Sequence, residues 1–393
     1  MDLPLSGVRV LDLSRLVPGA YASQMMADFG ADVIKVEEPE SGDYSRSMQP
    51  YGPGGMGLYF LALNRNKRSV TLNLKSEPGR EIFLRMMLKA DVVLESFRPG
   101  VLERLGLGYE QLKEKNAGII YCAISGYGQD GPYQLRAGHD LNYAGYAGLL
   151  HYNRSTQGDP VMPPTQFGDL AGGSQMAMIG ILTALVGRAR TGEGRRIDVS
   201  MTEGLLSLLS LSATTYLNTG KVPRPGHSSL DGGLPCYNIY ETQDGKHVTL
   251  AALEPKFWQT FCMRIGHLEL LPFHMPVGPG ESNEARDILK TIFKTRTRDE
   301  WLVELAEIDA CVGPVYDIGE ALNDVQAQAR NVSVSGNIDG EPFYSLASFP
   351  RISDVKIEQR HAPPSLGEHT EEVLREVGYS DAEIEQFREK GIL

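Results

Sequence analysis

The stretch VRVLDLSRLVPGAYASQMMADFGADVIKVE, residues 8–37, decides the fold class of this chain. The apolar run at residues 8–14 predicts a strand, and the run at residues 31–37 predicts a second one. Apolar side chains at helical spacing over residues 21–29 predict a helix between them. Parallel strands need a crossover connection, so this β-α-β unit predicts a parallel sheet.

The same pattern repeats through the first 125 residues. A helix is predicted in EPGREIFLRMMLKA, residues 77–90, with Pro78 in its first turn, where proline is tolerated. Further strands are predicted in KRSVTLNL (residues 67–74), DVVLESF (91–97) and AGIIYCAISGYG (117–128). Strands that alternate with helices indicate an α/β domain with a mostly parallel sheet covered by helices.

Beyond the parallel sheet, the sequence predicts further helices, a linker and, after the linker, a second, smaller domain of the α+β class. Residues 170–191 and 201–217 have helical spacing, with a short strand in RRIDVS between them, and the segment NTGKVPRPGHSSLDGGLP that follows indicates a linker. Beyond it we expect a β-hairpin around Asp244-Gly245, helices at residues 256–265, 283–294 and 298–307, and a strand in CVGPVYD. The last residues predict two amphipathic helices, the second capped by Ser380 with Glu383.

The composition is that of a globular protein. The 393 residues carry a net charge of −12, which argues against nucleic acid or an anionic membrane as partner, because a polyanion needs a basic surface. Four cysteines lie far apart without C-x-x-C spacing, so neither a zinc cluster nor a disulfide framework is expected. The longest apolar run, MAMIGILTALVG, has about twelve residues and predicts a buried helix rather than a membrane span. We expect the protein in the cytoplasm.

Several motifs with a fixed spacing are absent from the sequence. There is no G-x-G-x-x-G after the first strand and no G-x-x-x-x-G-K-[ST], so dinucleotide and P-loop sites lack their phosphate cradle. H-E-x-x-H and G-x-S-x-G are absent as well. Any chemistry must therefore come from single residues that the fold brings together.

Three acid/base residues are candidates for such chemistry. Asp169 precedes LAGG at the start of a predicted helix, either as its N-cap or as a carboxylate beside N–H groups that stabilise an oxyanion. His139, in AGHDLNYAG, is either an ordinary histidine or a general acid/base that titrates near neutrality. Glu254, just before Pro255, is either a helix cap or a functional carboxylate.

Basic residues gather in two short stretches. Arg65, Lys67 and Arg68 lie in NRNKRSV, and Arg98 lies in SFRPG. A charge run of this size forms a solvated turn or, in an acidic protein, holds phosphate groups. Arginine does so through a bidentate fork and lysine as a point charge.

Along nearly its whole length the chain resembles the class III CoA-transferase superfamily. The resemblance rests on GVRVLDLSRLVPGAYASQMMADFGADVIKVE, NRNKRSVTLNLK, FRPGVLERLGLG, YCAISGYGQDGPY, GDLAGG and GEHTEEVLREVGYS. It implies a Rossmann-like large domain, residues 1–220 and 331–393, and a small α+β domain with linkers, residues 221–330. It also implies ring-shaped protomers that form an interlocked homodimer.

Within that superfamily the chain is most similar to the alpha-methylacyl-CoA racemase branch. GHDLNY resembles the motif with the catalytic histidine, His139, and LDGGLPCYNIYETQDGKHVTLAALEPKF places the partner carboxylate on Glu254. IDACVGPV is also similar to the racemases. In contrast, Glu38 stands where racemases have a basic residue, and the following SGDYSR resembles the transferases.

The racemase resemblance implies an enzyme that epimerises 2-methylacyl-CoA thioesters. His139, oriented by Glu254, and Asp169 would remove and return the α-proton on opposite faces, while N–H groups of GDLAGG hold the enolate oxygen. No metal and no cofactor beyond the CoA of the substrate are expected. The transferase alternative makes Asp169 a nucleophile that forms a mixed anhydride, and a CoA-binding regulator is a third possibility.

The resemblance also implies where CoA binds. The residues are those of TLNLK, the two basic stretches and the turn that contains His139. They are Leu72, Asn73, Leu74, Lys75, Arg65, Arg68, Arg98, Gly138, Asp140, Asn142 and Tyr143.

Overall fold

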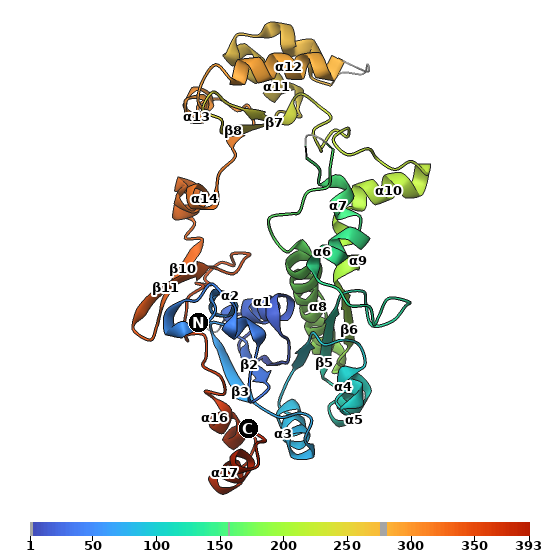
Figure 1. The fold of residues 1–393 in the computed structure, drawn as a ribbon, viewed down its shortest axis with the longest axis vertical. Helices are drawn as coiled ribbons and strands as arrows, with labels where there is room; N and C mark the ends of the chain where they lie inside the picture. Colours follow the sequence, from blue (N-terminus) through green and yellow to red (C-terminus); the bar gives the residue numbers. More distant parts are fainter. Residues whose placement is uncertain (1–2, 156–157, 276–280) are drawn as a thin grey trace. The chain divides into compact units, whose positions relative to one another are not determined.

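The computed structural model describes residues 3–155, 158–275 and 281–393 (Figure 1). The chain forms two compact units. The first unit comprises Met1–Leu149, Met162–Leu209 and Asn331–Leu393, and the second comprises Leu150–Val161 and Ser210–Arg330. These bounds differ from the predicted domains in two places, because residues 150–161 and 210–220 belong to the second unit.

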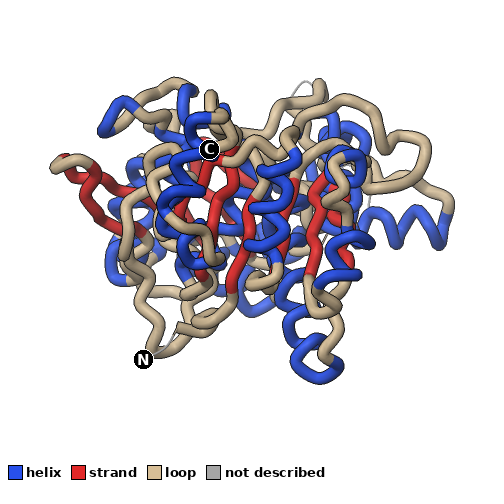
Figure 2. Tube along the Cα trace, turned by 90° about the horizontal axis from the view of Figure 1, so that it is seen from below, coloured by secondary structure: helices blue, strands red, loops and turns tan. Residues whose placement is uncertain are grey.

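A six-stranded parallel sheet lies at the centre of the first unit, and Figure 2 shows its strands side by side among helices. The strands are β1 (Arg9–Asp12), β2 (Asp32–Glu37), β3 (Lys67–Thr71), β4 (Val92–Glu95), β5 (Ile120–Ser125) and β6 (Arg196–Ser200). Their order is β3-β2-β1-β4-β5-β6, that of the doubly wound nucleotide-binding fold. The predicted parallel α/β sheet is confirmed.

Helices pack on both faces of this sheet. α1 contacts β1 and β4, and α8 contacts β5. Side chains of α3, α5, α16 and α17 share one hydrophobic core with the strands, through residues such as Leu11, Ile34 and Tyr121. The helices of this unit are α1 (Leu16–Asp28), α2 (Leu58–Leu63), α3 (Glu77–Met87), α4 (Val101–Arg104), α5 (Tyr109–Lys115), α6 (Asp140–Tyr146), α8 (Met176–Thr191), α9 (Met201–Leu208), α16 (Thr370–Glu376) and α17 (Asp381–Glu389).

Local sequence signals account for several of these boundaries. α1 begins five residues before the predicted start, and ten of its thirteen residues are buried, so it lacks the polar face that helical periodicity would reveal. At α17 the Ser380 hydroxyl accepts the Glu383 N–H, and the Glu383 carboxylate accepts the Ser380 N–H at 2.8 Å. The predicted capping box is therefore confirmed.

The helix predicted at residues 170–191 is longer than expected. It runs over Gly168–Thr191, and its first part, η3 (Gly168–Gln175), is π-helical. By length and composition these 24 residues could cross a membrane, unlike the twelve-residue apolar run taken from the sequence. In the fold, Ala177, Ile181 and Ala184 are buried, and a Cβ on Gly172 would lie 2.5 Å from the Met201 carbonyl oxygen. The glycine thus lets α9 approach closely.

The second unit contains an antiparallel sheet, as predicted. Its strands are β7 (Tyr237–Glu241), β8 (His247–Ala251) and β9 (Val312–Pro314), and Gly245 has a φ of 74° in the predicted turn. Aromatic side chains stack in its core, with Phe293 against Tyr240 and Phe261. The helices are α7 (Leu149–Tyr152), which begins one residue before the unit, α10 (Ser210–Thr219), α11 (Pro255–Ile265), α12 (Glu281–Phe293), α13 (Arg298–Leu305), α14 (Ile318–Asn323) and α15 (Val325–Ala329).

Several elements were not predicted. β10 (Ser333–Ile338) and β11 (Glu341–Leu346) form a hairpin in the first unit, closed by Asp339 and Gly340, both with positive φ. The Asp-Gly pair is the signal that would have identified it. The short helices α2, α6 and α14, and the 3₁₀ turns η1 (Tyr44–Ser47), η2 (Pro53–Gly55) and η4 (Leu268–Phe273), carry too few residues for a periodic pattern.

Candidate functional site

A cavity of about 320 Å³ opens at the carboxyl edge of the parallel sheet in the first unit. Its walls come from the segments that follow four strands: Arg15 and Leu16 after β1, Ser96–Pro99 after β4, Gly126 after β5 and Met201 after β6. The strand order reverses between β1 and β4. Ligands of open α/β sheets bind at such a reversal point, outside the carboxyl ends of the strands.

Asp169 lies in the wall of this cavity, in the π-helical first part of the long helix. Burial, and next the charge of Asp140, raise the pKa of its carboxyl group to about 7. The N-cap position of η3 is Phe167 rather than Asp169, so the interpretation of Asp169 as an N-cap is wrong. A half-buried carboxyl group with this pKa exchanges protons near neutrality.

Asp140 supplies the cap that Asp169 does not. Its Oδ1 accepts the N–H of Gly168 at 2.5 Å and that of Asp169 at 3.1 Å. Two of the N–H groups expected to hold an enolate oxygen are therefore already bonded. The same contacts bring a second carboxylate next to Asp169, and its charge adds to the effect of burial in raising the Asp169 pKa.

His139 lines the same cavity and belongs to the segment just before α6. The side chain is exposed, and its backbone N–H donates to the Asn142 amide oxygen at 3.1 Å. Asn142 thus orders the turn that carries His139. The structure brings His139 and Asp169 to one cavity, as the sequence predicted.

One tyrosine, Tyr143, lines the cavity, and further tyrosines pack behind it. Tyr143 is buried and its hydroxyl donates to the Gly138 carbonyl oxygen. Burial and the charge of Asp169 raise the pKa of Tyr143 to about 12, so it stays a neutral hydrogen-bond donor. Tyr127 packs edge-on against Tyr143 and Tyr146. Together they hold residues 138–143 in place.

Three arginines lie around the cavity. Arg98 was predicted, whereas Arg15 and Arg136 were not. Arg136 stacks over the Tyr133 ring at 4.4 Å, and Arg15 stacks over the Tyr44 ring at 5.0 Å. The sequence signal for Arg15 was its place directly after the first predicted strand, where ligands of such sheets bind.

Residues 72–75 follow β3, so they lie at the same edge of the sheet as the cavity, although they do not line it. Leu72 is 2% exposed and packs in the core. Asn73 accepts the Lys75 N–H through its side chain at 3.1 Å, and its own N–H donates to the Ile392 carbonyl oxygen at 2.8 Å. Lys75 is exposed and available to a ligand.

The structure contradicts the expected phosphate contacts of Arg65 and Arg68. Arg65 is 1% exposed and forms a two-pronged ion pair with Asp28, at 3.0 and 2.5 Å. Arg68 pairs with Asp32 and Glu376 at 2.7 and 2.6 Å. Both precede or begin β3, so they lie at the amino end of the strand, away from the cavity edge. These arginines hold the fold together.

Glu254 belongs to the second unit, where it occupies the N-cap position of α11. Its side chain is exposed and makes no capping hydrogen bond, so the helix-cap interpretation accounts for its position but not for its carboxylate. Among the described residues, no group of three or more His, Cys, Asp or Glu side chains is placed to hold a metal ion.

Comparison with known proteins gives one consistent result. Residues 5–370 match the family described as CoA-transferase family III. The chain is 38% identical to the alpha-methylacyl-CoA racemase of Mus musculus, over 99% of this chain and 97% of that one. It is 32% identical to the succinyl-CoA:glutarate CoA-transferase of Homo sapiens, over 99% and 90%. The crystal structure of a CAIB/BAIF family protein from Brucella suis superposes with a TM-score of 0.81, at 33% identity and over 96% and 100% of the two chains.

Proposed function

The chain belongs to CoA-transferase family III, and we propose that it epimerises 2-methylacyl-CoA thioesters by removing and returning the α-proton. The observation that carries this proposal is the pairing of His139 with Asp169 in one cavity, where the Asp169 pKa is about 7. A general acid/base works best when its pKa is close to the working pH. Epimerisation needs two such groups facing one carbon.

In the proposed reaction one of these residues takes the α-proton and the other delivers a proton to the opposite face. Which residue serves first depends on the enantiomer that binds. Each acid/base group contributes roughly 10²–10⁴-fold to the rate. We propose that Glu254 orients the imidazole of His139, as the family resemblance implies, and that no cofactor beyond the CoA moiety takes part.

The cations around the cavity support a CoA thioester as substrate. The protein has a net charge of −12, so a ligand that carries phosphates needs a local basic site. Arg15, Arg98 and Arg136 supply one beside the two acid/base groups. We propose that residues 72–75 and the turn at residues 138–143 complete the CoA contacts.

The family also contains transferases, and relatives with that activity match almost the whole chain. In that second candidate function, the Asp169 carboxylate attacks the thioester carbon, CoA leaves as thiolate and a mixed anhydride forms. The acceptor carboxylate next attacks the Asp169 carbonyl carbon of this anhydride and releases the donor acid as its carboxylate. The thiolate then attacks the acyl carbon of the new anhydride, which gives the CoA thioester of the acceptor and frees the Asp169 carboxylate. A carboxyl group with a pKa of about 7 can serve as an acid/base or, in its ionised form, as a nucleophile, so the preference for the racemase rests on the presence of His139 in the same cavity.

Deuterium exchange separates the two functions. Wild-type protein incubated with a 2-methylacyl-CoA in deuterium oxide, without an acceptor acid, should exchange the α-proton and interconvert both enantiomers. His139→Ala should retain exchange into one enantiomer only, and Asp169→Ala into the other at most. The racemase proposal fails if wild-type protein exchanges no α-proton but transfers CoA to an added acid, with hydroxylamine trapping the anhydride.

We further propose a homodimer, as the family resemblance implies, and a cytoplasmic location, as expected from the sequence. Apolar side chains on α8 and α10, including Ile179, Val186, Leu211 and Leu217, are more than half exposed in the single chain and would be covered by a second copy. Sedimentation at micromolar concentration should show a dimer. A stable folded monomer would contradict this assembly.

A further inference from the structure

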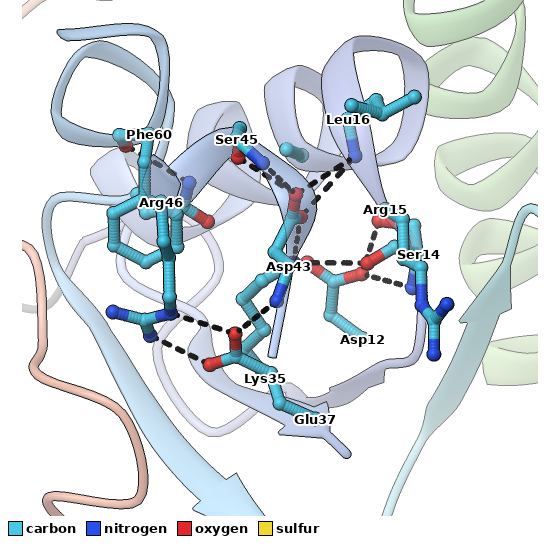
Figure 3. Close-up of polar contacts among 12 residues, drawn as sticks. Asp12, Ser14, Arg15, Leu16, Lys35, Glu37, Asp43, Ser45, Arg46 and Phe60 are labelled. Atoms are coloured by element: carbon cyan, nitrogen blue, oxygen red, sulfur yellow. Dashed lines mark hydrogen bonds and ion pairs between the residues drawn. The ribbon is translucent and has the colours of Figure 1, made fainter. Parts of the chain in front are cut away.

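A buried group of charges lies next to the loop after β1, the loop whose Arg15 and Leu16 line the cavity. The proposed reaction does not use these charges. Asp12 and Lys35 are 0% exposed, and Lys67 and Asp43 are 1% exposed. Figure 3 shows Asp12, Lys35 and Asp43. Lys35 pairs with Asp43 at 2.9 Å, and Lys67 pairs with Asp12 at 3.4 Å. Buried charges persist only when they are paired and hydrogen-bonded, so this group needs a reason to be there.

Asp43 makes the contact that links these charges to the cavity. Both of its carboxylate oxygens accept the backbone N–H of Leu16 at 3.2 Å (Figure 3). Oδ1 also accepts the N–H and the hydroxyl of Ser45, at 2.9 and 2.7 Å. A single carboxylate thus joins the turn after β2 to the loop after β1.

Leu16 has a backbone conformation that needs support. Its φ is 60°, in the left-handed region that residues with a side chain rarely adopt. Such a conformation persists only where surrounding groups hold it. Here the support comes from the hydrogen bonds between the Leu16 N–H and Asp43.

The same charges hold the loop at its first residue. Lys35 donates to the Ser14 carbonyl oxygen at 2.9 Å, and Asp12 accepts the Ser14 N–H at 2.9 Å. Arg15, between the two held residues, donates its N–H to the Ser96 hydroxyl at 3.1 Å and its guanidinium to the Tyr44 hydroxyl at 2.8 Å. The loop therefore has little freedom, and both Arg15 and Leu16 face the cavity.

Asp43 is itself fixed from behind. Its N–H donates to Glu37 Oε1 at 3.0 Å, and Glu37 pairs with Arg46 at 2.7 Å. Burial opposes ionisation of Asp43, but Lys35 and Ser45 outweigh it and lower the pKa to about 2. Asp43 is therefore a permanent anion at any pH at which the protein works.

We propose that Asp43 is a positioning residue for CoA binding, which acts by holding Leu16 in its left-handed conformation so that Arg15 is presented to the cavity. The proposal rests on the proposed function, because it takes CoA as the ligand. It assigns a task to the turn SGDYSR, which contributes no residue to the cavity wall. The binding loop is thus set from outside the site.

The test compares two isosteric substitutions of buried, paired aspartates in the same unit. Asp43→Asn removes the charge that holds Leu16, whereas Asp28→Asn removes the partner of Arg65, twelve helical residues from Leu16. Binding of free CoA is measured by calorimetry on the folded full-length proteins. We expect Asp43→Asn to weaken binding by about tenfold or more, as for a lost charge-assisted hydrogen bond, and Asp28→Asn to leave it unchanged.

The Leu16→Gly substitution tests whether Asp43 acts through the backbone conformation of Leu16 and not through the general stability of the protein. Glycine adopts positive φ without strain, so in this background Asp43→Asn should weaken CoA binding much less than it does in the wild-type background. Should Asp43→Asn not fold, Ser45→Ala loosens the same carboxylate and replaces it in the cycle, with a smaller loss expected.

The outcomes distinguish a failure of the proposed function from a failure of the positioning role of Asp43. Wild-type protein that does not bind CoA contradicts the proposed function. If the wild-type protein binds CoA and the Asp43→Asn variant binds it with equal affinity, only the positioning proposal is overturned. Equal losses in the Asp43 and Asp28 variants, or a loss that Leu16→Gly does not reduce, also overturn it, because they indicate general destabilisation.

Discussion

Two carboxyl groups at the same edge of the sheet have pKa values that are shifted in opposite directions. Asp43, behind the first loop, has a pKa lowered to about 2, and Asp169, in the cavity, has one raised to about 7. Both are buried enough for desolvation to oppose their charge. The difference is the neighbour: Asp43 has the ammonium of Lys35 at 2.9 Å, whereas Asp169 has the carboxylate of Asp140. Burial raises the pKa of both groups; at Asp43 the opposite charge of Lys35 outweighs it, whereas at Asp169 the like charge of Asp140 adds to it.

The largest effect should follow from removing the exchangeable acid. Asp169→Asn keeps the shape of the side chain but cannot carry the proton, so turnover of a 2-methylacyl-CoA should fall by about 10²–10⁴-fold. Chiral analysis of the thioester measures it, with thermal unfolding as the control for folding. Turnover within a factor of two of wild type would assign the acid/base role elsewhere.

Removing the fixed anion should act on stability. Asp43→Asn leaves Lys35 buried without its ion-pair partner, which should cost about 3–5 kcal/mol of unfolding free energy at pH 7. The folded pKa of Asp43 lies below its unfolded value of about 3.9, so the stabilisation is present above pH 4 and is lost as the pH falls toward 2. Urea unfolding at pH 7, 5 and 3 should show the gap between wild type and variant narrowing at pH 3. A gap independent of pH would contradict this assignment.

The arginines extend the comparison between paired and unpaired charges. Arg98 is exposed at the cavity, so Arg98→Ala should weaken CoA binding by about 1.5–3 kcal/mol while the fold stays intact. Arg65→Ala should leave the CoA affinity of the folded protein unchanged and lower its stability, because Arg65 is paired with Asp28. Calorimetry and urea unfolding on both variants check this. The reverse pattern would restore the phosphate role to Arg65.

The smallest effect is expected for the stability of the Asp169→Asn variant, and its sign should be opposite to that of the Asp43→Asn effect. The folded pKa of Asp169 lies above its unfolded value, so the wild-type protein loses stability as the pH rises from about 4 to 7. Asp169→Asn removes this loss and should be more stable than wild type by roughly 2 kcal/mol at pH 8, and equal to it near pH 4. Unfolding at both pH values measures it. A variant less stable than wild type at pH 8 would show that Asp169 is ionised and stabilised.

Much of the fold could be predicted because it is written in local patterns. The buried strand β5, IYCAIS, is a nearly continuous apolar run, and the order of strands and helices leaves few topologies. Asp169 was a candidate because it precedes a glycine pair at a predicted helix start, and His139 because it stands beside an aspartate among small residues. Element starts were less accurate, as at α1, where burial on all sides hides the period.

The partners of charged residues could not be predicted. The run NRNKR contains two arginines and a lysine that are all buried or nearly so, and nothing local distinguishes them from a solvated turn. Arg65 pairs with a residue 37 positions away and Lys67 with one 55 positions away. Lys35, the ion-pair partner of Asp43, lies in strand β2, and nothing in the sequence around it indicates this pairing. Which cations face a ligand and which face a carboxylate is a tertiary property.

The N–H of Asn73 donates to the carbonyl oxygen of Ile392, and Val373, Ile384 and Ile392 complete the core of the first unit. During synthesis, β1 to β6 are made before residues 331–393, and most of the second unit, Ser210–Arg330, is made in between. Part of the apolar face of the sheet therefore stays uncovered until residues 373–392 have been made. The hydrogen bond between Asn73 and Ile392 likewise forms only after the second unit has been made.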